Sequence, residues 1–447
     1  MNKAIPVFKQ WVPEWLIKVL LFLLQLPSIA LFFLPLANIN AGAGYYGCEP
    51  ADVQFAVALF FAGCAGFYSL ERRFFAYLAA KEYFVLFTFL QILTCLICYN
   101  TRELCILFPV RFIQGMLFCS TVNMSLSLMF TRLTSGRSRE ISFSVFFGIM
   151  LCAVPFNNLG TADLIDAYNF NVVYKEAAFA YLPCLCMLLL SMNSVRLNIR
   201  FPLYKLDWQS FSLFSIILCL IGYMLIYGQE YYWLEDDRMQ YSILAIAVLS
   251  VLYIIRQRSM KRPYLNLAIF KSRNLYVGLY VLFIMYICRL ASGVTNNFFT
   301  AVLGFDPIHL SYINLLNIAG LVGGVIISCC LLLQKRPIQY IWLPGFALLL
   351  VFHVSMFFLF NTQANAGNYL LPLFIQGLGV GMIMVPTIVY TIAAVPVAIG
   401  PSAAAASLTI RYFGFCASIG DNLATLAGFS LSRRRASQTQ GYSMLNG

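Results

Sequence analysis

The sequence predicts an all-α integral membrane protein with about thirteen transmembrane helices. Three observations predict it: 61% of the 447 residues are hydrophobic, 10% are charged, and the mean hydropathy is +0.81. A soluble globular protein carries roughly 25% charged residues, so this chain lies outside that class. The apolar runs are long and continuous, whereas the strands of a membrane barrel would be short and alternating, so a helical bundle is expected.

Thirteen apolar runs meet the requirement of ~20 residues for a helix that crosses a bilayer. We expect helices over residues 16–37, 51–70, 84–100, 104–130, 141–159, 177–194, 209–228, 240–256, 275–298, 309–333, 338–360, 369–395 and 403–429. The first run is longer than the apolar core of a signal peptide, so we expect it to be retained as the first transmembrane helix.

The basic residues follow the rule that cytoplasmic loops carry the lysines and arginines of a membrane protein. With a cytoplasmic N-terminus, the inner segments hold twenty of them and the outer loops between spans hold three, Arg102, Lys175 and Arg238. We therefore expect a multi-pass protein of the plasma (cytoplasmic) membrane. The net charge of +12 comes from the basic residues of these loops, where they set the topology, so we do not expect nucleic acid as a partner. The lipid bilayer is the expected partner.

Two long inner connectors, 195–208 and 256–274, divide the predicted helices into groups. We expect a six-helix bundle in residues 1–200, a central two-helix insertion in 201–258 and a second bundle in 259–447. Thirteen spans would leave the C-terminal end outside, although it carries Arg433-Arg434-Arg435. Either a late span is miscounted, or the second bundle lacks its final helix.

Nothing in the sequence predicts an enzyme, a metal site or a cofactor. There are two histidines, most of the fourteen cysteines are isolated in apolar runs, and no nucleophile elbow or Walker-type phosphate loop occurs. We interpret the cysteines as packing residues, since a free cysteine behaves as a small buried hydrophobe.

An arginine near the start of the fourth apolar run, Arg111, is the first candidate for a functional role. A charge inside a membrane span costs ~2.5–3.5 kcal/mol or more unless something compensates it. Gln114 lies one turn further on the same helix face, and Gly115 would allow a neighbouring helix to approach closely. We interpret the three as an inward, cavity-facing surface. The alternative is an arginine that snorkels to the interface.

The string Phe-Ile-Gln-Gly occurs at 112–115 and again at 374–377, each time near the start of an apolar run. The repeat predicts two related halves, in which Gln376 corresponds to Gln114, although Leu373 aligns with Arg111. The second copy continues through further small and kinking residues. In an apolar helix these residues indicate close packing rather than a nucleotide site: Gly377, Gly379, Gly381 and Pro386.

Three more ionisable residues fall inside predicted spans, where such groups are functional candidates by default. They are Arg289, Arg411 and Asp421.

Two further pairs are candidates for gating. Arg72 and Arg73 follow the second span, either as topological signals or as a cytoplasmic charge clasp between helices. Gly148 and Pro155 bracket a predicted break in the fifth span, either as a kink at a helix end or as a gating bend.

These features resemble the major facilitator superfamily, in its fourteen-helix drug:proton antiporter branch. The stretch 111–115 resembles the family's fourth-helix motif Arg-x-x-Gln-Gly. Residues 228–233 resemble the outer loop of the extra central helix pair, and residues 262–275 resemble the connector into the second bundle. Residues 376–386 and 400–420 are similar to the twelfth and thirteenth helices.

The resemblance implies two six-helix bundles around a central cavity that work by alternating access, and a missing fourteenth helix. The family's first helix usually carries an acidic residue for proton coupling, and the run 16–37 has none. A coupling carboxylate would then lie elsewhere, and Asp421 is the candidate.

We therefore expect a secondary active transporter that exports amphipathic organic compounds or drugs, with a small-molecule substrate and protons as coupling partners. Hydrophobic, aromatic cavities suit such ligands. Two alternatives stay open. One is a uniporter or importer of a small metabolite, and the other is a membrane sensor or assembly factor that uses this fold without transport.

Overall fold

A computed structural model describes residues 7–132, 138–196, 206–260, 263–290, 292–301, 303–305, 307–360 and 366–419. Within these ranges the regular elements are helices, apart from one isolated β-bridge between Phe8 and Met192.

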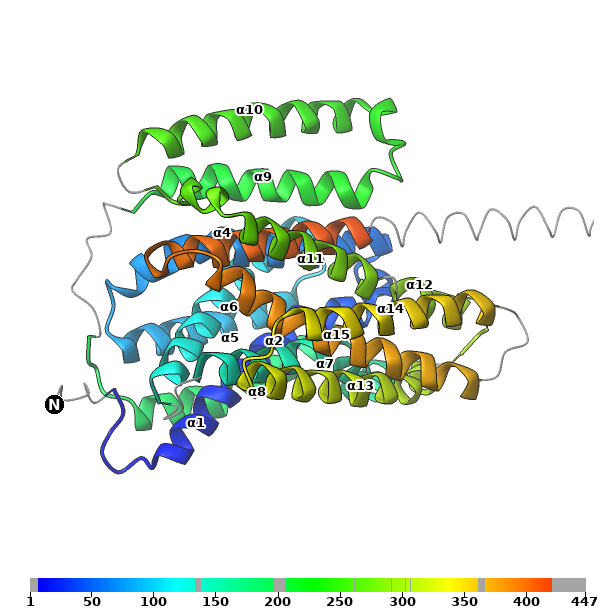
Figure 1. Cartoon of the computed structure of the whole chain (residues 1–447), viewed down its shortest axis with the longest axis horizontal. Coiled ribbons are helices and arrows are strands. Elements are labelled where there is room, and N and C mark those ends of the chain that lie inside the picture. The colour runs from blue at the N-terminus through cyan, green and yellow to red at the C-terminus, as the bar shows by residue number, and fades with distance from the viewer. Residues whose placement is uncertain are drawn as a thin grey trace, which may run out of the picture.

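The first half of the chain forms the helices α1 (Glu14–Leu23), α2 (Gln25–Ala37), α3 (Ile39–Tyr46), α4 (Pro50–Phe75), α5 (Ala80–Asn100), α6 (Leu104–Arg132), α7 (Ser138–Ala167) and α8 (Val172–Ser191). A pair follows, α9 (Trp208–Tyr227) and α10 (Asp237–Ser259). The second half forms α11 (Arg273–Leu290), α12 (Ser292–Ala301), α13 (Pro307–Leu333), α14 (Gln339–Leu359) and α15 (Gly367–Ala393). A further helix, without a label in Figure 1, is described over residues 400–419.

Each predicted span coincides with a helix, so the all-α membrane fold is confirmed. Eleven helical spans among the described residues are long and apolar enough to cross a membrane, and α1 and α2 together form the first of them. The predicted span 275–298 corresponds to α11 and α12, with residue 291 outside the described residues, and the span 403–429 is described up to residue 419. The chain is an integral multi-pass membrane protein.

Two helices extend beyond their predicted ends. α4 continues to Phe75, so Glu71 lies in the helix and not in the loop where the predicted span 51–70 left it. α7 continues to Ala167 without interruption at Gly148 or Pro155, so the predicted break is wrong. A proline removes one backbone hydrogen bond, but neighbouring helices can hold the kinked segment in place, and α7 packs against α2 and α13.

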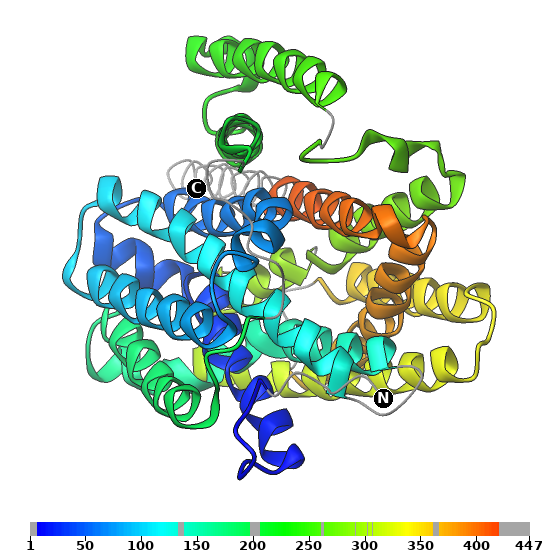
Figure 2. The ribbon, with the colours of Figure 1, turned by 90° about the vertical axis from the view of Figure 1, so that its left-hand side faces the viewer.

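The two halves of the chain lie side by side (Figure 2), with the early helices in blue to teal on one side and the late helices in yellow to red on the other. Two seams join them. α7 lies against α13, and α4 lies against the helix 400–419, where the Phe61 ring meets the rings of Tyr412 and Phe415 at centroid distances of 5.6 and 5.7 Å.

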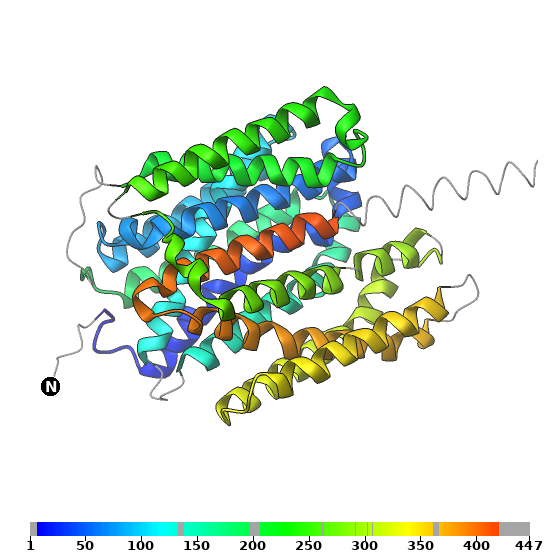
Figure 3. The same ribbon diagram turned by 45° about the horizontal axis from the view of Figure 1, so that its top comes forward.

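The pair α9–α10 lies outside this body, with its helices running roughly alongside the others (Figures 1 and 3). α9 packs on α4, and it also meets the second half, because the Tyr412 hydroxyl donates to the Leu218 carbonyl over 2.7 Å. α10 packs on α9 and exposes most of its apolar side chains, as expected for a helix that faces lipid.

A salt bridge joins the start of α9 to the end of α10. The Arg256 guanidinium lies 2.8 Å from the Asp207 carboxylate, and the Ser210 backbone N–H donates to the same carboxylate. Burial alone would raise the pKa of Asp207, but the hydrogen bonds from Ser210 and Arg256 outweigh it, so that the pKa is lowered.

The repeated Phe-Ile-Gln-Gly string marks the closest helix packing in both halves. A Cβ atom on Gly115 would lie 1.8 Å from the Phe60 carbonyl oxygen of α4, and one on Gly377 would lie 2.3 Å from the Asn317 carbonyl oxygen of α13. α6 therefore packs on α4 as α15 packs on α13. In each half the fourth predicted span approaches the second at a glycine, because any side chain would separate the two backbones.

We expect Gly115→Ala to lower stability by about 1–3 kcal/mol, since the added methyl group forces two backbones apart. Thermal unfolding of the purified protein in detergent measures the change. Gly160→Ala on α7 is the matched control, because a Cβ atom there meets nothing within 4 Å. Equal unfolding temperatures for the two variants would contradict the close-packing argument.

Candidate transport site

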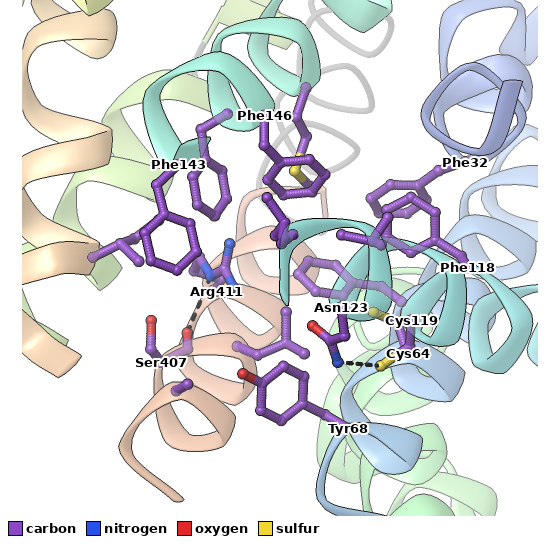
Figure 4. A pocket seen from close by; sticks show the side chains of 18 of the residues that line it. Phe32, Cys64, Tyr68, Phe118, Cys119, Asn123, Phe143, Phe146, Ser407 and Arg411 are labelled. Atoms are coloured by element: carbon purple, nitrogen blue, oxygen red, sulfur yellow. Dashed lines mark hydrogen bonds between the residues drawn. The ribbon is translucent and has the colours of Figure 1, made fainter. Parts of the chain in front are cut away.

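A cavity lies in the interface between the two halves. Its volume is about 70 Å³, and its walls come from α2, α4, α6 and α7 on one side and from α15 and the helix 400–419 on the other. Most lining side chains are apolar or aromatic, and the polar ones include Tyr68, Asn123, Ser407 and Arg411. Figure 4 shows the aromatic walls, with Phe32 and Phe118 on one side and Phe143 and Phe146 on another.

Arg411 is the predicted site residue that the structure brings to this cavity. Its side chain points into the cavity (Figure 4) and is 7% exposed. Its Nε donates to the Ser407 carbonyl at 3.3 Å, and its Cζ lies 5.2 Å from the centroid of the Phe147 ring. The salt bridges of the described residues join other groups, so no described carboxylate lies within 4 Å of this guanidinium.

Arg111 is not among the residues that line the cavity and is buried inside the first half, with 0% exposure. One terminal nitrogen donates to the Leu31 carbonyl at 3.1 Å and to Gln114 Oε1 at 2.9 Å, and the other donates to the Phe32 carbonyl at 3.2 Å. Its Cζ lies 4.6 Å from the centroid of the Phe60 ring. The charge is compensated by backbone dipoles, an amide oxygen and a ring face, so it connects α6 to α2 and α4.

Gln376 occupies the corresponding place in the second half. Its Oε1 accepts a hydrogen bond from the Asn317 side chain at 2.5 Å, and its Nε2 donates to the Arg289 carbonyl of α11 at 3.3 Å. The Arg289 guanidinium itself donates to the Leu151 carbonyl of α7 at 3.4 Å. Gln376 thus connects α15 to α11 and α13, while Arg289 reaches across the seam to the first half.

The arginines after the second span lie at the end of the molecule that the charge distribution predicts to be cytoplasmic. Arg72 is exposed, and Arg73 donates to the Pro263 carbonyl at 3.4 Å. The neighbouring Tyr264 hydroxyl donates to the Gly66 carbonyl of α4. These contacts connect α4 to the segment that leads into α11, through backbone carbonyls rather than through an acid.

The remaining candidates lie along the packing faces. A Cβ atom on Gly148 would lie 3.5 Å from Val325 Cγ1 of α13, which puts this residue at the seam. Pro155 is half-buried in α7, and Pro386 is buried inside α15. Gly379 and Gly381 face the backbones of α14 and α13. Asp421 and the segment 433–435 lie outside the described residues.

Glu71 is a further candidate that the interpretation of the sequence did not single out. Its side chain is buried, and it accepts a hydrogen bond from the Tyr83 hydroxyl at 3.0 Å. The Asn123 side chain, which lines the cavity, lies beside the same carboxylate. A signal was present, because Cys64, Tyr68 and Glu71 follow one another at four- and three-residue spacings and so share one face of α4.

No group of three or more histidine, cysteine, aspartate or glutamate side chains among the described residues could hold a metal ion.

Comparisons with known proteins bear on the fold. The sequence matches no protein-family model, and no curated protein matches it. Solved structures do match over nearly the whole chain.

A POT family transporter in complex with 5-aminolevulinic acid has a TM-score of 0.62 at 14% identity, covering 96% of this chain and 98% of that one. The human organic anion transporter MFSD10 (TETRAN) has a TM-score of 0.55 at 13% identity, covering 92% and 93%. The nucleoside transporter NupG has a TM-score of 0.54 at 11% identity, covering 90% of each chain. The chain therefore has a transporter fold of the major facilitator type.

We expect Arg111→Met to destabilise the protein, because it leaves the Leu31 and Phe32 carbonyls and Gln114 without their donor. Each buried acceptor that loses its partner costs about 1–3 kcal/mol. Thermal unfolding in detergent measures the loss, and the exposed Arg102→Met is the control. An unchanged unfolding temperature in Arg111→Met would show that this network does not stabilise the first half.

Proposed function

We propose that the protein is a secondary transporter that moves a small organic solute across the membrane by alternating access. One observation carries the proposal: the cavity lies between the two halves, and both halves contribute its walls. In transporters built from two repeated halves, the substrate site lies at the interface between them, and rocking of one half against the other exposes it to each side in turn.

The packing supports a rocking motion. Within each half, helices meet backbone to backbone at Gly115 and at Gly377, which favours movement of each half as a rigid body. Between the halves, the contacts of the described residues include the packing of α7 on α13, a hydrogen bond from Arg289 to a carbonyl and the edge-on rings of Phe61 and Tyr412. Such contacts can be exchanged for others without a cavity opening in either half. We propose residues 1–200 and 259–447 as the two bodies, joined in the sequence by the insertion 201–258.

We also propose the class of substrate and the branch of the family. Aromatic walls suit an amphipathic compound, which supports export of drugs or similar solutes. The pair α9–α10, which lies between the two halves in the sequence, supports the fourteen-helix drug:proton antiporter branch.

Proton coupling is proposed through Glu71. This carboxylate is buried beside Asn123 of the cavity wall, and no arginine or lysine of the described residues forms a salt bridge with it. Carboxylates inside membrane spans serve as proton relays in pumps and transporters. Binding or release of a proton at Glu71 would change the charge next to the cavity in step with the rocking motion.

A screen that measures uptake of labelled compounds into membrane vesicles, with and without a pH gradient, would distinguish the two alternative functions. A uniporter or importer would catalyse counter-flow of a labelled metabolite without any effect of a pH gradient. A sensor or assembly factor would move none of the amphipathic compounds and none of the metabolites tested.

We expect a disulfide across the seam to stop transport. In Gly148→Cys/Val325→Cys the two side chains meet between α7 and α13, since a Cβ atom at 148 lies 3.5 Å from Val325 Cγ1. Oxidation should reduce uptake of a compound found in the vesicle screen to background, and reduction should restore it. Each single variant is the control for the native cysteines. Full uptake by the cross-linked protein would rule out rocking at this seam.

We expect Glu71→Gln to make transport insensitive to a pH gradient, because an amide cannot exchange the proton. Uptake into proteoliposomes with and without the gradient measures the effect, and the exposed Glu103→Gln is the matched control. If the wild type is already insensitive, or if Glu71→Gln retains the full pH response, Glu71 is not the coupling residue.

A further inference from the structure

We infer that the central cavity selects amphipathic organic anions, with Arg411 binding the anionic group and the phenylalanine walls holding the apolar body. The inference names a substrate class for the transport site proposed above and rests on that proposal for its role in transport. The binding site itself is argued from the cavity alone.

The first argument is charge. Among the described residues that line the cavity, Arg411 is the only arginine, lysine, aspartate or glutamate. A buried charge is costly unless it is paired or well hydrogen-bonded. Here the protein offers one carbonyl at 3.3 Å and one ring face at 5.2 Å. The cavity therefore keeps an uncompensated positive charge, and an anion is the ligand that would compensate it.

The second argument is the number of unused donors. A guanidinium has five N–H groups in a planar fork that matches a carboxylate or phosphate with two parallel hydrogen bonds. Arg411 uses Nε for the Ser407 carbonyl, and its terminal nitrogens have no hydrogen-bond partner among the described residues. Arg111 differs, since both of its terminal nitrogens already have carbonyl or amide acceptors. Of these two buried arginines, Arg411 is the one equipped to take a ligand.

The third argument is a second polar group on the same wall. Ser407 lies one turn before Arg411, and both residues line the cavity (Figure 4). The Ser407 hydroxyl is buried and has no hydrogen-bond partner. Buried polar groups are normally satisfied, so an unpaired hydroxyl beside an unpaired guanidinium indicates a place for an acceptor group. An anionic oxygen could accept from both.

The walls define the rest of the ligand. The other lining side chains include six phenylalanines, which give the cavity an apolar surface: Phe32, Phe61, Phe118, Phe143, Phe146 and Phe147. The volume of about 70 Å³ is below the ~300–1,000 Å³ of drug-sized pockets. A ligand with an aromatic body would therefore have to widen the cavity, which separation of the two halves would allow. Glu71 is not among the lining residues, and its carboxylate accepts from Tyr83.

The test uses three naphthalene compounds that differ only in the polar group: naphthoate, its neutral methyl ester and naphthylmethylammonium. The full chain is placed in phosphatidylcholine nanodiscs, and its unfolding temperature is measured against the concentration of each compound. A ligand that binds only the folded state raises this temperature. We expect naphthoate to raise it at the lowest concentration, the ester to do so weakly and the ammonium compound not at all.

Variants then assign the effect to the site. Arg411→Gln should weaken naphthoate binding by roughly ten- to a hundredfold, since a hydrogen bond to a charged group is lost. Arg411→Lys should retain part of the affinity, and Ser407→Ala should lower it less than Arg411→Gln does. Each variant is first compared with the wild type for elution and for its unfolding temperature without ligand. If Arg411→Gln does not fold, the affinities of the wild type for the three naphthalene compounds and the affinity of Arg411→Lys for naphthoate test the anion site.

The inference is overturned if naphthylmethylammonium binds as well as naphthoate, if naphthoate does not bind, or if Arg411→Gln leaves its affinity unchanged. A further experiment measures the unfolding temperature in nanodiscs that also contain phosphatidylglycerol, an anionic lipid. An Arg411-dependent stabilisation by this lipid would support the anion site and identify its source as a lipid headgroup. Binding of naphthoate without uptake into proteoliposomes contradicts the proposed transport function but not the anion site. Uptake of the ammonium compound without naphthoate binding contradicts only the anion site.

Discussion

Burial of the Arg111 charge is the constraint on which the first half of the structure depends. A guanidinium with 0% exposure must find acceptors within the protein, and it finds them at the Leu31 and Phe32 carbonyls of α2 and at Gln114 of its own helix. One turn later Gly115 allows α6 to meet the backbone of α4. A single stretch of five residues therefore fixes one helix against two others, because the hydrogen bonds need α2 in place and the glycine contact needs α4 in place.

The second half keeps the geometry and replaces the charge. Gln376 donates to a carbonyl of α11 and accepts from Asn317 of α13, and Gly377 brings α15 against α13. An amide makes fewer and weaker hydrogen bonds than a guanidinium, but it carries no charge to bury. The two Phe-Ile-Gln-Gly strings are thus two versions of one packing unit, and the positive charge inside the second half lies elsewhere, at the seam and at the cavity.

In the function that we propose, the residues that stabilise the fold differ from those that bind the substrate. Arg111 has its acceptors within one half, so its charge is unavailable to a ligand. Arg411 lines the cavity and has N–H groups without an acceptor among the described residues, and Glu71 lies beside Asn123 of the cavity wall. The connector through Pro263 and Tyr264 touches α4 at the end of the molecule where the charge pattern predicts the cytoplasm. Each half therefore has close helix packing inside it, and in the mechanism that we propose the two halves move against each other around the cavity that both of them line.

The sequence by itself determined the class of protein and the approximate place of each membrane span, because the length and hydropathy of a span are local properties of the chain. The repeat could also be predicted from the sequence, because the Phe-Ile-Gln-Gly strings at 112–115 and 374–377 are identical and each lies near the start of an apolar run. Only the tertiary structure decided the roles of Arg111, Arg289 and Arg411, which depend on the helix that each side chain faces. The same holds for Glu71, which a hydropathy rule assigns to a loop and which packing against Tyr83 buries. A continuous α7 was likewise decided by its neighbours, because packing can hold a helix through a proline that its local sequence would end.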